Sequence, residues 1–426
     1  MNVLLVGSGG REDAIARKIT ESDVLFSVIT NENPSIIGMA RQYIKYTGES
    51  QPVIDFARKY GIDIAFIGPD DILNTDLADR LRESHIPVAS PGKKAAMIET
   101  SKEYMRHIME KYHIPGNIEN KTFTESNEME TFLQSSDSDY AIKPIGLTGG
   151  KGVKVMGLQL NGKEEAIKYA REIIGRDGKV LLEKREIGEE FSIQAFTDGK
   201  NLVYMPVVQD YKRLYEDDLG PNTGGMGSIS DKNFILPFLS IDMVNDARAI
   251  LSNIVTAMRN DGNEFHGVMY GQFMSSSNGL KVIEINARFA DPEGINVLTL
   301  LKSNIVDIFL DIYSGTLKNN VVFQNRATVL KYIVPPGYGI KPQETKLSIK
   351  TGTETENFKI YYSSVYGTMD NVITTKSRAI ALIGIADSIY EASDIVENNL
   401  KYVRGDYYIR HDIGTESMMK RKIKAQ

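Results

Sequence analysis

The stretch KVIEINARFADPEG, residues 281–294, carries the strongest indication of the fold. Its first half reads as an apolar strand in which Glu284 and Asn286 stand two positions apart, so their side chains leave the same face. Ile283 and Ile285 are expected to point to the other face. Two oxygen-bearing side chains on one face suit Mg²⁺, which prefers oxygen ligands and keeps waters and substrate phosphates in its shell. The alternative is a half-exposed strand whose polar residues face water.

Two charged residues follow this strand at once. Arg288 and Asp291 stand in the loop that ends the stretch, a cation close to an anion. A simple solvated strand end does not need such a pair. The loop therefore favours the interpretation of residues 281–294 as a metal-binding strand with adjacent functional groups.

A glycine-rich loop between two predicted strands, 140–144 and 153–157, offers an anion site. Its candidates are the lysines and glycines of IKPIGLTGGKGVKV: Lys143, Gly149, Gly150, Lys151 and Gly152. Glycines leave backbone amides open to an anion. The loop fails the P-loop pattern GxxxxGK[ST], which would need glycine at 145 and Ser or Thr at 152. Because it joins two strands, it can fold as a hinged β flap; the alternative is a hairpin whose lysines face water.

Two later segments combine turns with charged residues. In LLEKREIGEEFS, Glu183 lies on an apolar strand and Glu190 follows a turn, where a carboxylate can accept hydrogen bonds from a ribose diol. In QDYKRLYEDDLGPNTGGMGS, the candidates are Asp210, Lys212, Arg213, Asn222, Thr223, Gly224 and Gly225. Lysine and arginine pair with carboxylates and phosphates, and glycines let the backbone approach a ligand closely. For both segments the alternative is a tight turn with solvated charges.

The chain opens MNVLLVGSGGRED, an apolar strand followed by a glycine turn. Gly7 and Gly9 fit the dinucleotide fingerprint G-x-G-x-x-G, but its third position is Glu12, whose carboxylate would repel a pyrophosphate. Backbone amides of Gly9, Gly10 and Arg11 can still cradle a small anionic or sugar-bearing ligand. A bound dinucleotide and a purely structural turn stay open as alternatives.

Composition narrows the class of protein. The 426 residues are enough for two to four domains, and the net charge of −6 argues against a nucleic-acid partner. The absence of cysteine excludes a disulfide framework, a cysteine metal site and a thiol nucleophile. The N-terminal apolar run is too short for a signal peptide, and no stretch approaches the roughly 20 apolar residues that span a bilayer. We therefore expect a cytoplasmic enzyme without a membrane partner, and a solvated basic tail at 420–422.

Changes of pattern divide the chain into three parts. Residues 1–98 alternate strand and helix signals, which predicts an α/β domain with a Rossmann-like parallel sheet. Residues 99–318 mix helices with β segments and include a long predicted helix near 242–260. From 319 to 426 the character changes to strands followed by a helix near 387–400, which predicts an α+β C-terminal domain.

Taken together, VGSGGRE, GLTGGKGV, QDYKR with GPNTGGMGS, and VIEINARFADPE resemble the phosphoribosylamine–glycine ligases (glycinamide ribonucleotide synthetases) of the ATP-grasp superfamily. The resemblance spans nearly the whole chain. It implies a central ATP-grasp domain with a flap subdomain at about 121–186. It also implies ATP-dependent ligation of glycine to 5-phosphoribosylamine, through a glycyl phosphate, in purine biosynthesis, by a monomer or homodimer.

The resemblance also assigns nucleotide and metal contacts by position. The nucleotide-binding residues it implies are Lys102, Lys143, Gly149, Gly150, Lys151, Gly152, Glu183 and Glu190. The lysines would contact ATP phosphates, the loop would close over them, and the glutamates would hold the adenosine part. Glu284 and Asn286 would ligate Mg²⁺ or Mn²⁺ between the β- and γ-phosphates.

The remaining assignments concern the other two substrates. The catalytic residues implied are Arg288, Asp291 and Lys151. The substrate-binding residues implied are Gly9, Gly10, Arg11, Glu12, Asp210, Lys212, Arg213, Asn222, Thr223, Gly224, Gly225 and Arg288. Among them, Arg288 would neutralise the acyl phosphate or the incoming carboxylate, and the opening turn would meet the phosphoribosylamine.

The chain departs from the family pattern at a few positions, which we expect around the acceptor pocket. The family has REHA where this chain has Asp13, and RFGDPETQ where it has Ala290, Gly294 and Ile295. It also has GPEAPL where this chain has GPDDIL at 68–73. Other readings are a related carboxylate–amine ligase, a nicotinamide-dependent oxidoreductase and a non-catalytic nucleotide-binding module. The NTGGMG turn disfavours the first, Glu12 disfavours the second, and the Glu284/Asn286 pair disfavours the third.

Overall fold

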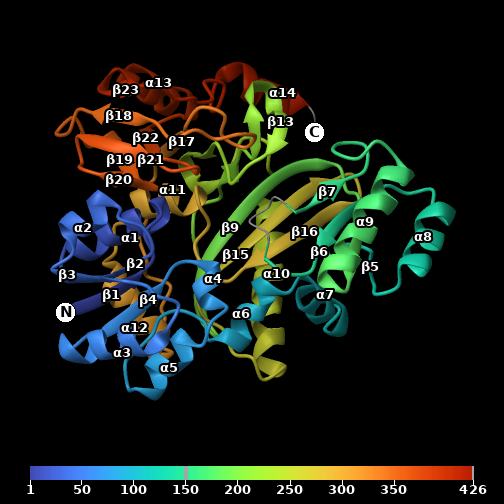
Figure 1. The fold of residues 1–426 in the computed structure, drawn as a ribbon, viewed down its shortest axis with the longest axis horizontal. Coiled ribbons are helices and arrows are strands. Elements are labelled where there is room, and N and C mark those ends of the chain that lie inside the picture. Colours follow the sequence, from blue (N-terminus) through green and yellow to red (C-terminus); the bar gives the residue numbers. More distant parts are fainter. Residues whose placement is uncertain (148–151, 425–426) are drawn as a thin grey trace.

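The computed structural model describes residues 1–147 and 152–424 of the chain. Figure 1 shows N-terminal helices and strands in blue, long central strands in green and yellow, and C-terminal strands in orange and red. An antiparallel unit in teal and green stands on the opposite side of the central strands from the N-terminal region. Within the described residues, no helix is both long and apolar enough to cross a bilayer.

The N-terminal region contains the predicted parallel sheet, with strand order β3-β2-β1-β4. Its elements are β1 (Asn2–Val6), α1 (Gly10–Thr20), β2 (Val24–Ile29), α2 (Pro34–Met39), β3 (Gln42–Lys45), α3 (Ser50–Lys59), β4 (Ile64–Ile67), α4 (Asp70–Leu73) and α5 (Leu77–Glu83). Val3 pairs with Leu25 on one side and Ile64 on the other. A central parallel strand is covered on both faces, which is why it reads as a continuous apolar run. The turns after β1 and β4 therefore meet at one edge of the sheet, where open α/β sheets bind ligands.

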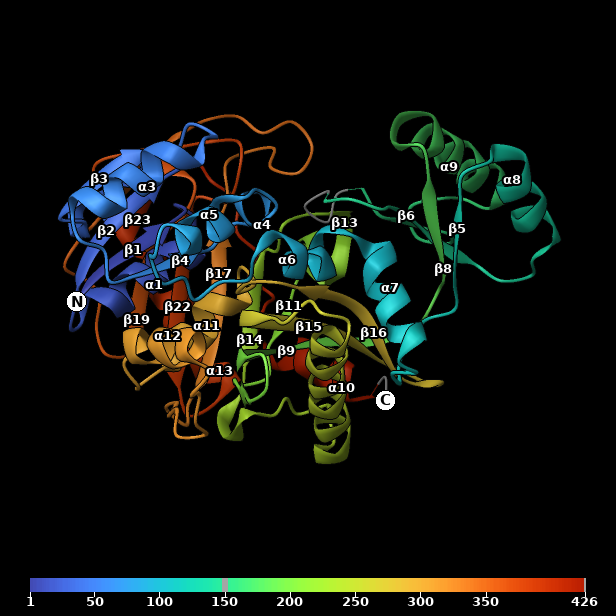
Figure 2. The same cartoon turned by 90° about the horizontal axis from the view of Figure 1, so that it is seen from below.

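A second unit surrounds the glycine-rich loop and projects to one side in Figure 2. Helices α6 (Lys93–Thr100) and α7 (Lys102–Lys111) lead into it. Its elements are β5 (Asn120–Phe123), α8 (Ser126–Ser135), β6 (Tyr140–Pro144), β7 (Lys154–Val155), α9 (Lys163–Asp177) and β8 (Val180–Lys184). The sheet order is β5-β8-β6-β7, and all pairs are antiparallel. Phe123, Met129 and Ile142 belong to a small core of its own, so this unit packs independently of the central sheet.

The central sheet has the order β10-β9-β15-β16 and is antiparallel. It is built from β9 (Gly188–Asp198), β10 (Leu202–Tyr204), β15 (His266–Ser276) and β16 (Gly279–Asn286). Helices α10 (Ile241–Asn260) and α12 (Ile305–Ser314) pack against it, and α11 (Glu293–Leu300) follows β16. The predicted helix near 242–260 is confirmed. Ser240 begins α10, because its side chain accepts a hydrogen bond from the Met243 amide.

A third sheet joins strands from the middle and the end of the chain, in the order β11-β14-β17-β22-β19. The middle of the chain supplies β11 (Gln209–Asp210), β12 (Arg213–Tyr215), η1 (Glu216–Asp218), β13 (Leu219–Asn222), β14 (Gly227–Ser230) and η2 (Lys232–Phe234). Strand β14 pairs with β17, with Gly227 opposite Lys331. The strands on either side of residue 318 thus share one sheet. The domain boundaries stay predictions.

The C-terminal part is α+β, as predicted. Its elements are β17 (Ala327–Ile333), β18 (Lys346–Ile349), β19 (Phe358–Tyr362), β20 (Val365–Gly367), β21 (Asn371–Thr374), β22 (Ile380–Ala386), α13 (Ile389–Asn399), η3 (Leu400–Tyr402), β23 (Val403–Gly405) and α14 (Glu416–Lys424). A small sheet, β20-β21-β18-β23, completes it. Helix α13 covers β22 and β17, and an ion pair between Arg421 and Asp217 ties α14 to η1.

Candidate active site

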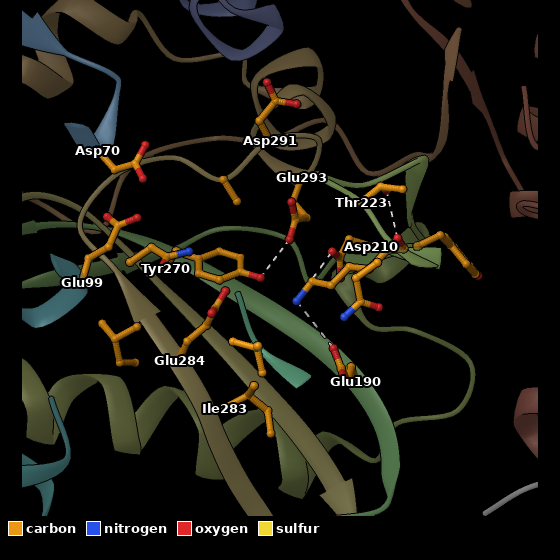
Figure 3. A pocket seen from close by; sticks show the side chains of 18 of the residues that line it. Asp70, Glu99, Glu190, Asp210, Thr223, Tyr270, Ile283, Glu284, Asp291 and Glu293 are labelled. Carbon is orange, nitrogen blue, oxygen red and sulfur yellow. Dashed lines mark hydrogen bonds and ion pairs between the residues drawn. The ribbon is translucent and has the colours of Figure 1, made fainter. Parts of the chain in front are cut away.

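A cavity of about 780 Å³ lies where the described regions meet. Most of the predicted site residues line it: Gly9, Arg11, Glu12, Lys102, Lys143, Glu183, Glu190, Asp210, Lys212, Arg213, Asn222, Thr223, Gly224, Glu284, Asn286, Arg288 and Asp291. Gly10, Gly152 and Gly225 are described but do not line it. Gly149, Gly150 and Lys151 lie outside the described residues. Residues from both ends and the middle of the sequence thus contribute to one cavity; Figure 3 labels a part of them, between Asp70 and Glu293.

Glu284 and Asn286 both line the cavity, as the metal-strand prediction requires. The expectation for Ile283 was wrong, because Ile283 is half-buried and lines the cavity; Ile285 is buried in the core and only borders the cavity. The register explains this: Glu284 pairs with Gln272 but Val282 pairs with Phe273, so Ile283 is the extra residue of a β-bulge. A bulge breaks the alternation of faces at one residue. Ile283 therefore adds an apolar surface beside the carboxylate of Glu284 (Figure 3).

The surroundings of Glu284 keep its carboxylate ionised. Burial alone would raise its pKa, but Lys212, Lys143, Lys102 and Arg288 outweigh burial and lower it. The described residues hold no group of three His, Asp or Glu side chains arranged for a metal. An ionised carboxylate beside one amide, with lysines around it, fits a cation whose remaining ligands are phosphates and water.

One end of the cavity is basic. Lys102 Nζ donates to the carbonyl of Gly146 at 2.8 Å, and burial followed by Lys143 lowers its pKa. Lys143 Nζ lies 2.5 Å from Glu183 Oε2, and Arg106 Nε lies 2.8 Å from Glu183 Oε1. Both oxygens of Glu183 are thus occupied, and its side chain is buried. A ribose hydroxyl would have to compete with these contacts, whereas Lys143 is held in place for an anion.

The pair of cations around Glu183 makes the protein sensitive to acid. Burial opposes ionisation, but Arg106 and Lys143 lower the pKa of Glu183 from 4.5 to about 2, which corresponds to about 3 kcal/mol of stabilisation. When a carboxyl group has a lower pKa in the folded than in the unfolded chain, it stabilises the fold at any pH above the unfolded pKa. This stabilisation is lost as the pH falls toward the folded pKa. We expect wild type to have a higher midpoint of thermal unfolding than Glu183→Gln at about pH 6. This difference should shrink as the pH is lowered to about 3.

The control for this measurement is Glu119→Gln. Glu119 is 68% exposed and pairs with Lys184 at 3.3 Å, so its replacement should shift the midpoint little at any of these pH values. A difference between wild type and Glu183→Gln that stays constant on acidification would contradict the ion-pair argument.

Arg288 is held by a carboxylate that the sequence analysis did not single out. Arg288 Nη2 lies 2.8 Å from Glu99 Oε1, and the other oxygen of Glu99 accepts from the Ala287 amide at 2.7 Å. Burial raises the pKa of Glu99 to about 7, against the effect of Arg288. Arg288 Nε is buried and has no hydrogen-bond partner among the described residues. A buried donor of this kind is costly to leave unpaired, so a ligand oxygen is its expected partner.

The middle of the cavity is crowded with carboxylates around one lysine. Lys212 Nζ donates to Gln272 Oε1 at 2.6 Å and lies 3.8 Å from Glu190 and 3.9 Å from Asp210. Burial raises the pKa of Asp210, and the carboxylate of Glu293 adds to this although Lys212 acts against it. Such a cluster attracts a further positive group. The cluster therefore suits a substrate amine.

Glu293 takes part in the same cluster through a tyrosine. Tyr270 Oη donates to Glu293 Oε1 at 2.9 Å, and Figure 3 shows this contact as a dashed line. Burial raises the pKa of Glu293. Both residues lie in the central sheet or directly after it, so they are fixed relative to Glu284.

In the opening glycine turn, the side chains of Arg11 and Glu12 bind each other and the turn backbone. Arg11 Nε lies 2.5 Å from Glu12 Oε1, and Glu12 Oε2 accepts from the Gly9 amide at 2.7 Å. Arg11 also donates to the carbonyl of Phe289 at 2.8 Å. A substrate amine would have to compete with these contacts of Glu12. The turn thus lies directly against the loop that carries Arg288.

Asp291 lies where the beginning, middle and end of the chain meet. Its Oδ2 accepts from the Arg11 amide at 3.4 Å, and its Oδ1 accepts from Tyr332 Oη at 2.7 Å. Arg378 lies 3.2 Å from Oδ1 and also donates to the carbonyls of Asp291 and Gly224. This carboxylate is therefore held by two other regions of the fold.

The turn from Asn222 to Gly227 packs tightly against this junction. Thr223 Oγ1 donates to the carbonyl of Lys212 at 2.9 Å and accepts from the Gly225 amide at 3.1 Å. Gly225 has a φ of +106°, and a Cβ atom there would lie 2.7 Å from Pro292. Only glycine fits such a position. The Arg213 side chain donates instead to the carbonyl of Gly220 at 2.8 Å, within the hairpin of β12 and β13.

Two sequence comparisons agree with this geometry. The family model described as "Phosphoribosylglycinamide synthetase, N domain" matches residues 1–99. The model described as "Phosphoribosylglycinamide synthetase, ATP-grasp (A) domain" matches residues 100–294. The chain belongs to the phosphoribosylglycinamide synthetase family. The predicted resemblance and the prediction of an ATP-grasp ligase are confirmed.

Relatives of the phosphoribosylglycinamide synthetase family extend the match to the whole chain. A phosphoribosylamine–glycine ligase from Methanothermobacter thermautotrophicus is 43% identical over 431 residues, covering 100% of this chain and 98% of the relative. A crystal structure of phosphoribosylamine–glycine ligase from Thermotoga maritima has a TM-score of 0.82 at 24% identity, covering 97% of this chain and 100% of that one. The biotin carboxylase domain of 2-oxoglutarate carboxylase from Hydrogenobacter thermophilus, solved with MgADP, has a TM-score of 0.75 at 16% identity, covering 96% and 91%. The predicted fold is confirmed.

The departures from the phosphoribosylglycinamide synthetase pattern mostly lie outside the cavity, contrary to expectation. Asp13 is buried and accepts a hydrogen bond from the Tyr362 amide at 2.8 Å, so it ties α1 to β19. Gly294 and Ile295 are buried in α11. Of the departing positions, Ala290 and, within 68–73, Asp70 line the cavity. The sequence pattern placed all of them beside site residues, but the fold buries Asp13, Gly294 and Ile295 in the core.

Several cavity residues of this synthetase were not singled out from the sequence: Glu99, Tyr270, Glu293, Arg378 and Lys422. Arg106 and Gln272 were missed as well; they contact the cavity residues Glu183 and Lys212 from behind the lining. Glu293 stands in the quoted stretch, and its nearness to Asp291 was the available signal. Glu99 and Arg106 lie on helices beside Lys102, and helical periodicity alone does not show which side faces a ligand. Arg378 and Lys422 come from the far end of the chain.

Proposed function

We propose that the protein joins glycine to 5-phosphoribosylamine at the expense of ATP, giving glycinamide ribonucleotide, ADP and phosphate through a glycyl phosphate. The observation that carries this proposal is the set of groups gathered around Glu284 in one cavity. Lys212, Lys143, Lys102 and Arg288 all lie close enough to lower the pKa of Glu284, and further carboxylates surround Lys212. An anion site, a cation site and an amine site thus adjoin one another.

The first step transfers a phosphoryl group to glycine. A carboxylate oxygen of glycine attacks the γ-phosphorus of ATP, and the bond to ADP breaks. Arg288 donates through its unpaired Nε to the incoming carboxylate, while Glu99 holds the other side of the guanidinium. Lys102 and Lys143 bind the phosphates. Catalysis then rests on positioning and charge neutralisation.

The cation site belongs to the same step. Glu284 and Asn286 would hold Mg²⁺ or Mn²⁺, as the ionised state of Glu284 and its place on the cavity wall support. Such an ion supplies positive charge that offsets the charge of the transferred phosphate. The related carboxylase domain solved with MgADP supports the choice of a divalent ion.

The second step needs an amine beside the acyl phosphate. The nitrogen of phosphoribosylamine attacks the carbonyl carbon, phosphate leaves, and the nitrogen loses a proton. Asp210 and Glu293, whose pKa values burial raises, can hold that proton. The turn at Gly9 to Arg11 adjoins Asp291, which supports a place for the sugar phosphate there.

Release of ADP tests the substrates. We expect stoichiometric ADP release with glycine and phosphoribosylamine together, and none with either alone. The measurement couples ADP to a reporter enzyme and varies the amine. ADP release with glycine and a different amine, at equal rate, would move the assignment to another acceptor.

Three expectations from the sequence stay predictions. We place the protein in the cytoplasm, as a monomer or homodimer, acting on small molecules rather than nucleic acid. The negative net charge supports the last point. Analytical ultracentrifugation gives the oligomeric state.

A further inference from the structure

The C-terminal helix α14 returns to the cavity. Met418 and Met419 are buried and fix the helix to the protein core. Lys422 lines the cavity, is 12% exposed, and donates to Glu189 Oε2 at 2.8 Å. The prediction of a solvated basic tail is therefore wrong for Lys422. It holds for Lys420, which is 64% exposed and pairs only with Glu416 on the same helix.

Lys422 shares one aromatic ring with a second cation. Its Nζ lies 5.4 Å from the centroid of the Tyr211 ring, and the Arg410 guanidinium carbon lies 5.3 Å from the same centroid. Tyr211 is buried, and its hydroxyl has no hydrogen-bond partner among the described residues. The ring is thus held by packing and by two cations rather than through its polar end. Cation–π contacts strengthen when they are shielded from water.

Arg410 holds the start of β12, two residues after Tyr211. It has no exposed surface and donates to the carbonyl of Arg213 at 3.0 Å. Asp218 and Asp412 neutralise it, at 2.9 and 2.7 Å. A buried arginine with two carboxylates is fixed in place. We call Arg410 and Lys422 together the C-terminal clamp.

Tyr211 stands between two residues of the amine cluster. Asp210 and Lys212 flank it in the chain, and both line the cavity; Asp210 is labelled in Figure 3. The Tyr211 amide donates to Gly227 at 2.9 Å, and its carbonyl accepts from Met226 at 2.7 Å. A shift of the ring therefore moves the backbone that carries both neighbours.

We propose that the C-terminal clamp positions the Asp210–Lys212 pair through Tyr211, so that Lys422 is a positioning residue for the acceptor half of the reaction. Only the expected change in glycine kinetics rests on the proposed function; the positioning of Tyr211 by the clamp does not depend on it. The clamp acts on the segment from Asp210 to Arg213, which carries the groups that face the substrate amine and carboxylate. Among the described residues, the hydrogen bonds and ion pairs of the α14 side chains go to Glu189 and Asp217 or stay near the helix, and none goes to Lys102 or Lys143.

The test compares Lys422→Met with Lys420→Met. The substitution is the same and lies on the same helix, but Lys422 is largely buried and Lys420 is exposed. For K422M we expect kcat/KM for glycine to fall about tenfold, with KM for ATP changed less than about twofold. Amide exchange at Tyr211 and Met226, followed by mass spectrometry, should rise about tenfold in K422M. K420M should match wild type in both measurements, and Lys422→Arg should restore most of the loss.

The two readouts separate this proposal from the proposed function. If wild type releases no ADP with glycine and phosphoribosylamine, the proposed reaction is wrong. Faster amide exchange at Tyr211 in K422M but not in K420M would still support the clamp. K422M that exchanges like K420M overturns the proposal. A rise in KM for ATP with unchanged glycine kinetics also overturns it, because Lys422 would then act on the nucleotide. A K422M protein that does not fold is replaced by K422R and Lys422→Gln, and equal exchange in those two overturns the proposal as well.

Discussion

Replacing Glu284 by alanine should lower turnover by about three orders of magnitude and leave the fold intact. Glu284 is the carboxylate of the predicted metal pair, and Lys212, Lys143, Lys102 and Arg288 keep it ionised. Without it the divalent ion loses its charged protein ligand, and the phosphates lose their alignment. The measurements are ADP release with saturating substrates and the midpoint of thermal unfolding.

The matched control is Glu119→Ala. Glu119 is also a glutamate beside a lysine, but it is 68% exposed and outside the cavity lining, so its loss should leave turnover within about twofold of wild type. A folded Glu284→Ala protein with near-normal ADP release would remove Glu284 from the metal site. Raising the Mg²⁺ concentration should recover part of the lost activity if the variant only binds the ion more weakly.

Replacing Arg288 by lysine should lower kcat by about a hundredfold although the charge is kept. Glu99 occupies one side of the guanidinium, and the buried Nε on the other side has no partner among the described residues. An ammonium group cannot bind Glu99 and a substrate oxygen in this fixed geometry. The expected kinetic pattern is a large loss in kcat with KM for ATP nearly unchanged, measured by ADP release at varied ATP.

Arg176→Lys is the control for this change. Arg176 is 61% exposed and pairs with the neighbouring Asp177, so kinetics should not change. Equal kcat in Arg288→Lys and wild type would show that charge alone suffices and that the unpaired Nε has no role. A loss that appears only in KM for ATP would instead place Arg288 at the nucleotide.

The fold could be predicted in outline because its strands and helices carry clear periodicities. The continuous apolar run of β1 predicts a parallel strand covered on both faces, and the structure contains it. The long helix α10 was also predicted near its true bounds. Pairing between β14 and β17 could not be predicted, because it depends on contacts between residues about a hundred positions apart.

The positions of cavity residues could be predicted where they lie together on one short stretch of sequence. Glu284 and Asn286 stand on one strand, so the period of two was enough to place both on the cavity wall. The same rule failed at Ile283, since a bulge adds one residue that alternation does not reveal. Local patterns thus place these two side chains on the cavity wall but do not reveal the irregularities that shape it.

Residues that act through distant contacts were missed. Glu99 reaches Arg288 and Ala287 from a helix far earlier in the chain. Lys422 belongs to a basic triplet that is typical of a solvated tail, and only the course of α14 distinguishes it from Lys420. These roles depend on tertiary packing, which no single segment encodes.

The contacts of Asp291 have a consequence for synthesis of the polypeptide. Arg11 reaches this carboxylate from the first helix, and Tyr332 and Arg378 reach it from the last quarter of the chain. A ribosome must deliver nearly the entire polypeptide before these groups can meet. A nascent or truncated chain that folds its middle part early therefore lacks these contacts of Asp291.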